Sequence, residues 1–360
     1  MTDDPTILPP ALSAASAPGT PGSEAAQALL ARLARRGSIS DDVLALVDGP
    51  LAAAVGAAAE YAAKAITPQT VATYQADWRD FAIWSRQHGV DPALLPIHPV
   101  VIAAWLATLA PQIGRSALRR RVAAIAYHHR SRGQAWQSSP MAIRQTLAGI
   151  VREHRRPVRP AAALTSAEVK RLIAVCSGDL AGLRDRALFL VGLAGAFRRA
   201  ELVGIDVAHL RFTGSGVIIH LPRSKTDQAG EGADVALPRG RDPVTCPVRA
   251  LETWLQRAKL RRGPVFRRLT AAGTIEGRLT GDGVYKILRT RAQAAGLSVP
   301  ATERLSPHGL RAGLIVEASL NGALDEQIMP HSRHKHLGSM RGYRRRARLV
   351  VDNPASLLDL

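Results

Sequence analysis

The chain has 360 residues, of which 46% are hydrophobic, and its 48 Lys and Arg against 29 Asp and Glu give a net charge of +19. This length predicts two domains, and the positive charge predicts nucleic acid or another anionic surface as the partner. Its two cysteines exclude a disulfide framework, and without a basic, apolar leader or a proline-free apolar span we expect a cytoplasmic protein outside the membrane.

The first 65 residues form two segments. Residues 1–22 are rich in Ala, Pro, Ser, Thr and Gly without periodicity, which predicts a disordered tail. Residues 23–65 are rich in Ala and are predicted to form a helical N-terminal extension.

Residues 66–155 carry four helical patterns and are predicted to form a helical domain. Thr67 can cap and Pro68 can open the first helix, which is expected to end at His88-Gly89. The other three helices are expected at residues 100–109, after Ser116 and after Pro140.

Arginines on and after this bundle are candidates for phosphate contacts. Arg119, Arg120 and Arg121 share the third helix, where the alternative is an ordinary solvated face. Arg155 and Arg156 lie in a basic stretch broken by prolines, where an interdomain linker (156–164) is predicted.

Residues 165–348 are predicted to form a second, α+β domain. Thr165 and Glu168 make a capping box, and an apolar run at 187–197 predicts a buried helix. The remaining elements are strands at 217–222 and 233–237 and helices at 247–260 and 282–295. This order predicts a mainly helical domain with a small antiparallel sheet.

The chemistry is concentrated near the C-terminus. His308 and Arg311 are three residues apart and so share one face of a helix, which Ser306 is expected to cap and Pro307 to open. A planar cation beside an imidazole suits a phosphate, because a guanidinium matches its oxygens and stays charged.

A second pair of residues extends this motif. His334 stands in the segment Arg333-His334-Lys335, and Tyr343 follows it by nine residues. Together with H-x-x-R, this segment resembles the catalytic end of the tyrosine recombinases, the phage-integrase family. The upstream residues agree with the resemblance, since Arg198 is followed by Glu201 and Lys225 lies between two predicted strands.

The resemblance implies a site, a fold and an activity. The catalytic residues would be Arg198, Lys225, His308, Arg311, His334 and Tyr343, with Glu201 supporting Arg198 and Arg199 contacting DNA. The fold would be a SAM-like helical bundle at residues 66–155, which clamps DNA, followed by the recombinase catalytic domain. Where this family often has Leu-Gly before the second His, the chain has Ser332-Arg333, a departure that we expect to alter local packing more than chemistry.

The implied activity is site-specific recombination of double-stranded DNA. Tyr343 would attack a phosphodiester held by the arginines, and Lys225 would protonate the departing 5′-oxygen. The 3′-phosphotyrosine product keeps the bond energy, so neither a cofactor nor a metal is expected. Two sites would meet in a homo-oligomer, a tetrameric synapse, with the apolar tail (349–360) exchanged between subunits.

Two other functions share these features. A type IB topoisomerase uses the same chemistry on one duplex, and a DNA-binding regulator could keep the scaffold without catalysis. The tail favours a recombinase over the first, and the intact catalytic set argues against the second. A metal site at His331, His334 and His336 is not expected, since Arg333 and Lys335 lie between them and no acidic ligand is near.

Overall fold

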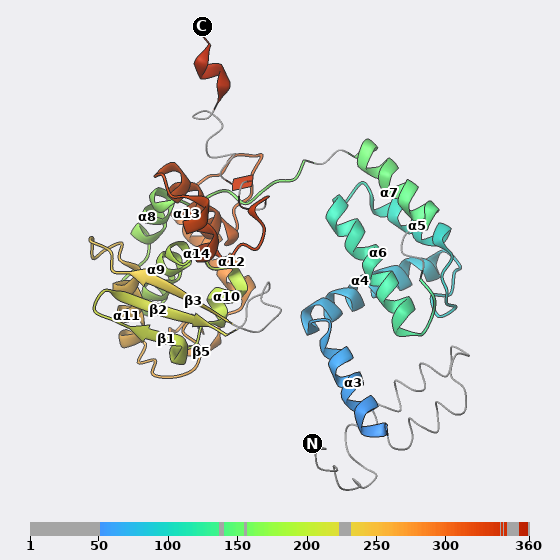
Figure 1. The fold of residues 1–360 in the computed structure, drawn as a ribbon, viewed down its shortest axis with the longest axis horizontal. Helices are drawn as coiled ribbons and strands as arrows, with labels where there is room; N and C mark the ends of the chain where they lie inside the picture. The colour runs from blue at the N-terminus through green and yellow to red at the C-terminus, as the bar shows by residue number, and fades with distance from the viewer. Residues whose placement is uncertain are drawn as a thin grey trace, which may run out of the picture. The chain divides into compact units, whose positions relative to one another are not determined.

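The computed structural model describes residues 51–136, 140–154, 157–222, 232–338, 340, 342–343 and 353–358. The chain divides into two units, Met1–Arg156 and Pro157–Leu360 (Figure 1). The predicted tail at 1–22 lies outside the described residues, as does most of the predicted extension.

All the regular secondary structure that is described in unit 1 is helical. Its helices are α3 (Ala52–Lys64), α4 (Pro68–Gln87), α5 (Pro99–Leu109), α6 (Arg115–Ser131) and α7 (Met141–Glu153). The predicted start of α4 is confirmed, because the Thr67 side chain accepts a hydrogen bond from the Thr70 N–H at 3.3 Å and Pro68 follows it. The predicted start of α6 is wrong by two residues, since the helix begins at Arg115, directly after Gly114.

The core of unit 1 joins α4, α5 and α6. Phe81 and Trp105 are buried and meet edge to face, with ring centroids 5.1 Å apart. His129, also buried, accepts a hydrogen bond from the Ile97 N–H at 2.9 Å through Nε2, and its Nδ1 donates to Ile125 O at 2.8 Å. Both ring nitrogens are therefore satisfied, which makes His129 a structural residue.

Unit 2 combines helices with two small antiparallel sheets. Its helices are α8 (Ser166–Ala174), α9 (Leu180–Ala194), α10 (Arg199–Gly204), α11 (Pro247–Arg257), α12 (Gly281–Ala294), α13 (His308–Leu320) and α14 (Asp325–Ser332), with 3₁₀ turns η1 (Val207–His209) and η2 (Pro354–Leu357). The strands are β1 (Leu210–Phe212), β2 (Gly216–Leu221), β3 (Ala233–Pro238), β4 (Arg267–Leu269) and β5 (Ile275–Arg278).

The larger sheet has the order β1-β2-β3 and lies beside α9 and α11 (Figure 1). Val217 pairs with Leu237, and Ile219 with Val235, in the antiparallel register. All four side chains are buried, because alternate residues of a strand point to the same face. These side chains belong to the core of this unit, to which α9 and α11 also contribute.

The sequence predicts most of these elements but misplaces some ends. The capping box of Thr165 and Glu168 is confirmed at α8, as are the strands that became β2 and β3. The predicted helix 187–197 is wrong at both ends, since α9 runs from Leu180 to Ala194. Ser306 does not cap α13, because its buried hydroxyl makes no hydrogen bond to the described residues.

Among the described residues, no helix is both long enough and apolar enough to cross a membrane. The uncharged window that begins at Pro92 contains α5, whose Ile102, Trp105 and Leu106 side chains are buried in the core of unit 1. This agrees with the expectation of one buried helix there.

Candidate active site

Arg198 lies in a turn that the left-handed residue Ala196 creates after α9. Ala196 has a φ of 46°, and the next residue, Phe197, is buried. Arg198 then occupies the N-cap of α10, where the first helical N–H groups lack intrahelical partners. Its backbone N–H donates to Glu201 at 2.9 Å, and its guanidinium donates to the same carboxylate. The R-x-x-E spacing therefore places the carboxylate where it holds Arg198.

Helix α13 brings Arg311 to the same turn. Arg311 is fully buried, and its Nη1 donates to Ala196 O at 2.8 Å. On another side of α13, Gly309 and Gly313 allow the helix to pack closely against the segment 162–164, because a Cβ at either position would overlap a carbonyl oxygen of that segment. Burial, together with the charges of neighbouring arginines, lowers the pKa of Arg311 to about 9. This value is still above neutral pH, and Arg311 therefore stays charged there.

Tyr343 and His308 are in direct polar contact. Tyr343 Oη lies 2.6 Å from His308 Nε2, although 35 residues separate them in the chain. Burial lowers the pKa of His308, and the charges of Arg311, Arg198 and Arg304 lower it further. With its own hydrogen on Nδ1, the neutral imidazole can accept a hydrogen bond from the phenol and is able to act as a base.

His334 supplies a second imidazole after α14. Its Nδ1 lies 2.7 Å from Ser332 Oγ and 3.2 Å from Nη2 of Arg311, and its ring centroid is 6.3 Å from that of Tyr343. Burial, followed by the charges of Arg311 and its neighbours, lowers the pKa of His334 to about 4. At neutral pH this ring is therefore uncharged, and it takes part in the site as a hydrogen-bonding group.

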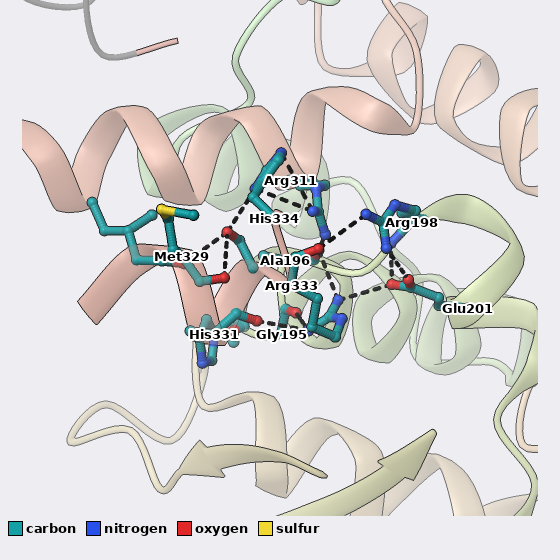
Figure 2. Close-up of polar contacts among 12 residues, drawn as sticks. Gly195, Ala196, Arg198, Glu201, Arg311, Met329, His331, Arg333 and His334 are labelled. Atoms are coloured by element: carbon teal, nitrogen blue, oxygen red, sulfur yellow. Dashed lines mark hydrogen bonds and ion pairs between the residues drawn. The ribbon is translucent and has the colours of Figure 1, made fainter. Parts of the chain in front are cut away.

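Six of the predicted site residues thus gather in unit 2, four of which are labelled in Figure 2. They are Arg198, Glu201, His308, Arg311, His334 and Tyr343. Lys225 lies outside the described residues, and its catalytic role stays a prediction.

The sequence did not identify Arg333 as part of the site. Its side chain is 8% exposed and donates to the carboxylate of Glu201 at 2.8 Å. The available signal was an arginine directly before the second His, where the family often has Gly. Spacing alone could not show where this side chain points.

The arginines predicted to bind DNA through α6 differ in their surroundings. Arg120 donates twice to buried Asp77, at 2.8 Å each, and Arg121 pairs with Asp77 at 3.7 Å and Asp80 at 3.4 Å. Arg119 is exposed and makes no ion pair with any described residue. Arg119 is therefore the member of the run that is free to meet a phosphate.

The other predicted DNA contacts are less defined. Arg199 is exposed and pairs with Asp282 at 3.2 Å across solvent-accessible surface. Such a pair is weak, and it leaves Arg199 available to another anion. Arg155 and Arg156 lie outside the described residues.

The histidines near the site do not form a metal cluster in the described part of the chain. No group of three or more His, Cys, Asp or Glu side chains there could hold a metal ion. His331 instead lies with Nε2 2.7 Å from Ala194 O, a contact that ties α14 to the end of α9.

Comparisons with known proteins agree with this site. The model of the phage integrase family matches residues 162–348. The chain is 33% identical over 295 residues to an integrase/recombinase XerD homolog of Selenomonas ruminantium, which covers 81% of this chain and 85% of that protein.

Two solved structures share the fold. The XerH recombinase bound to palindromic difH substrate has a TM-score of 0.56 at 14% identity and covers 80% of this chain and 79% of its own. A lambda integrase dimer bound to a COC′ core site has a TM-score of 0.54 at 16% identity and covers 86% and 87%. The predicted fold class, a helical N-terminal unit followed by a recombinase catalytic unit, is confirmed.

The recombinase relative and the family match, taken with the gathered residues, favour recombination over the topoisomerase and regulator alternatives. The chain belongs to the phage integrase family and is a tyrosine recombinase, a DNA strand-transfer enzyme.

Proposed function

We propose that the enzyme cleaves and rejoins strands of duplex DNA through a 3′-phosphotyrosine link at Tyr343. The contact of 2.6 Å between Tyr343 Oη and His308 Nε2 carries the proposal, because it pairs a nucleophile with a neutral base. Arg198 and Arg311 lie beside this pair and supply the positive field that a phosphodiester requires.

Cleavage exchanges one phosphoester bond for another. Tyr343 Oη bonds to phosphorus as its proton passes to His308, and the P–O5′ bond breaks with Lys225 protonating the 5′-oxygen. Arg198 and Arg311 bind the non-bridging oxygens, on which negative charge grows in the transition state; one such contact is commonly worth ~3 kcal/mol of barrier or more. Attack by a 5′-hydroxyl on the phosphotyrosine reverses these steps, so no high-energy cofactor takes part.

Arg311 is more deeply buried than Arg198. Its residue surface is 0% exposed, whereas the Arg198 side chain is 20% exposed. Arg198 is therefore the more accessible of the two arginines that we propose to bind the phosphate.

The polarity of the covalent link tests the proposal. Full-length protein would be incubated with a nicked suicide duplex carrying a site selected from a random-sequence DNA pool. The trapped complex should release a fragment with a free 5′-hydroxyl, which polynucleotide kinase labels without prior phosphatase. An adduct on the 5′ side, or no adduct, would contradict the proposed chemistry.

Duplex DNA is the proposed partner of both units, which places the enzyme in the cytoplasm where that substrate lies. Arg119→Ala should weaken half-site binding and lower the slope of log affinity against log salt by about one, because a phosphate contact is lost. The matched variant Arg120→Ala should leave that slope unchanged and lower the free energy of unfolding by about 1–3 kcal/mol, since Asp77 loses its bidentate partner. Salt titrations by gel shift and denaturant unfolding measure the two effects. The assignment of Arg119 to DNA is wrong if both variants give the wild-type slope.

We also propose that four subunits assemble two sites into a synapse through the C-terminal tail. Leu358, next to the 3₁₀ turn η2, is 60% exposed, and apolar residues surround it in the sequence. Truncation after Arg346 should leave binding to one half-site nearly normal and abolish the synaptic complex on native gels. Recombination of two sites at the normal rate by the truncated protein would show that the tail does not dock.

A further inference from the structure

Arg333 occupies a backbone position that disfavours side chains. It ends α14 with φ 55° and ψ 45°, and only Ala196 and Lys259 share a positive φ among the described residues that are not Gly. Glycine adopts this conformation freely, whereas any Cβ strains it. An arginine there indicates that its side chain makes contacts that offset the strain.

Those contacts join the two loops of the active site (Figure 2). Nη1 of Arg333 donates to Gly195 O at 3.2 Å and to His331 O at 2.7 Å, and Nη2 donates to Ala196 O at 3.1 Å. In return, Nη2 of Arg198 donates to the backbone carbonyl of Arg333 at 3.1 Å. The backbone of each loop therefore accepts hydrogen bonds from the arginine of the other loop.

The carboxylate of Glu201 links both arginines. It is 3% exposed and lies between Nη1 of Arg198 and Nη2 of Arg333. Burial by itself raises the pKa of Glu201, but the charge of Arg333 and the hydrogen bonds from Arg198 outweigh it and leave the pKa lowered. Glu201 is therefore ionised at neutral pH.

The charges of this buried group do not cancel. Two guanidinium groups and one carboxylate sum to one positive charge, whereas Arg198 and Glu201 alone would sum to zero. Arg333 also lies over the Phe197 ring, 5.1 Å from its centroid, which keeps its own charge out of solvent.

We propose that Arg333 is a positioning residue for strand cleavage: its buried guanidinium balances Glu201, so that Glu201 holds Arg198 in place without neutralising it. The inference rests on the proposed role of Arg198 at the scissile phosphate. It adds a charge requirement at a position where the sequence was expected to alter local packing more than chemistry.

Arg333→Gly tests the requirement without backbone strain. Full-length variants would cleave the selected suicide duplex in single turnover, with half-site affinity and thermal unfolding measured alongside. Arg333→Gly should cleave about 10- to 100-fold more slowly, as expected when a group that orients the chemistry is lost, with a much smaller change in half-site affinity. Arg333→Lys, which keeps the charge, should recover most of the rate.

Two further variants separate charge from structure. Lys259→Gly relaxes a left-handed residue that is exposed and lies just after α11, and it should cleave at the wild-type rate. Glu201→Gln added to Arg333→Gly removes the unbalanced carboxylate, and it should restore at least part of the lost rate, because Arg198 regains its net charge. On a duplex with a neutral methylphosphonate at the scissile position, the defect of Arg333→Gly should shrink.

The outcomes are distinct for the two proposals. Wild-type cleavage by a folded Arg333→Gly, or a double variant slower than that single variant, would overturn the role of Arg333 and leave the chemistry at Tyr343 intact. If Arg333→Gly does not fold, Arg333→Lys and the double variant still decide, since both keep the balance of charge. Absence of a wild-type covalent adduct would instead contradict the proposed function itself.

Discussion

Tyr343→Phe is expected to bind DNA with nearly normal affinity and to form no covalent adduct. The substitution removes only the oxygen that we propose as the nucleophile, and the ring keeps its place beside Ile315, Ile328 and Met340. Loss of a nucleophile in other enzymes slows the reaction on the order of 10⁶-fold, which here means no detectable cleavage. A denaturing gel of protein with the suicide duplex measures the adduct, and a gel shift measures the affinity.

Tyr285→Phe is the matched control for this variant. Tyr285 lies on α12, is 37% exposed, and should lose its hydroxyl without effect on cleavage. A shifted covalent band from Tyr343→Phe would remove Tyr343 from its role. Loss of the band from Tyr285→Phe would show that the assay reports folding and not chemistry.

Lys225→Ala is expected to cleave ordinary DNA about 10²- to 10⁴-fold more slowly, because the 5′-oxygen is a poor leaving group without a proton. Sulfur in place of that bridging oxygen leaves as a thiolate, which needs no general acid. The variant should therefore recover on the sulfur-bridged substrate. Rates on the two substrates, measured in single turnover, give the comparison.

Arg311→Ala supplies the contrast. The guanidinium of Arg311 is proposed to stabilise the non-bridging oxygens, which the sulfur substitution leaves unchanged. This variant should therefore stay slow on both substrates. Equal defects of Lys225→Ala on both substrates would mean that Lys225 binds phosphate or base and that another residue delivers the proton.

Helix starts could be predicted from the sequence because their stabilising contacts are local. Thr67 accepts from the N–H three residues later, and Glu168 reaches back to the Thr165 N–H at 2.8 Å. All partners of such a cap lie within one turn of the chain. The same reasoning failed at Ser306, whose hydroxyl is buried where the packing of α13 offers it no partner among the described residues.

The end of α9 could not be predicted, since distant residues determine it. Ala196 takes a left-handed conformation that a sequence reading does not expect of alanine. Its carbonyl accepts from Arg311 and Arg333, which are 115 and 137 residues away. These bonds hold the turn that presents Arg198.

The basic run on α6 shows the same limit. Three neighbouring arginines look equivalent in the sequence, yet Asp77, 43 residues before Arg120, binds that side chain through both carboxylate oxygens. Whether a charged side chain meets DNA or its own protein depends on which carboxylates the fold brings near it.

The sequence by itself determined the residue types of the candidate site, their order, and the spacing that places Arg198 beside Glu201 and His308 one helical turn from Arg311. The tertiary structure decided the directions of the pKa shifts, the left-handed turn and the contacts of Arg333. Residue type follows from the chain alone, but a pKa or an ion pair depends on burial and on distances between remote segments. Those distances exist only after α9, α13 and α14 have packed together.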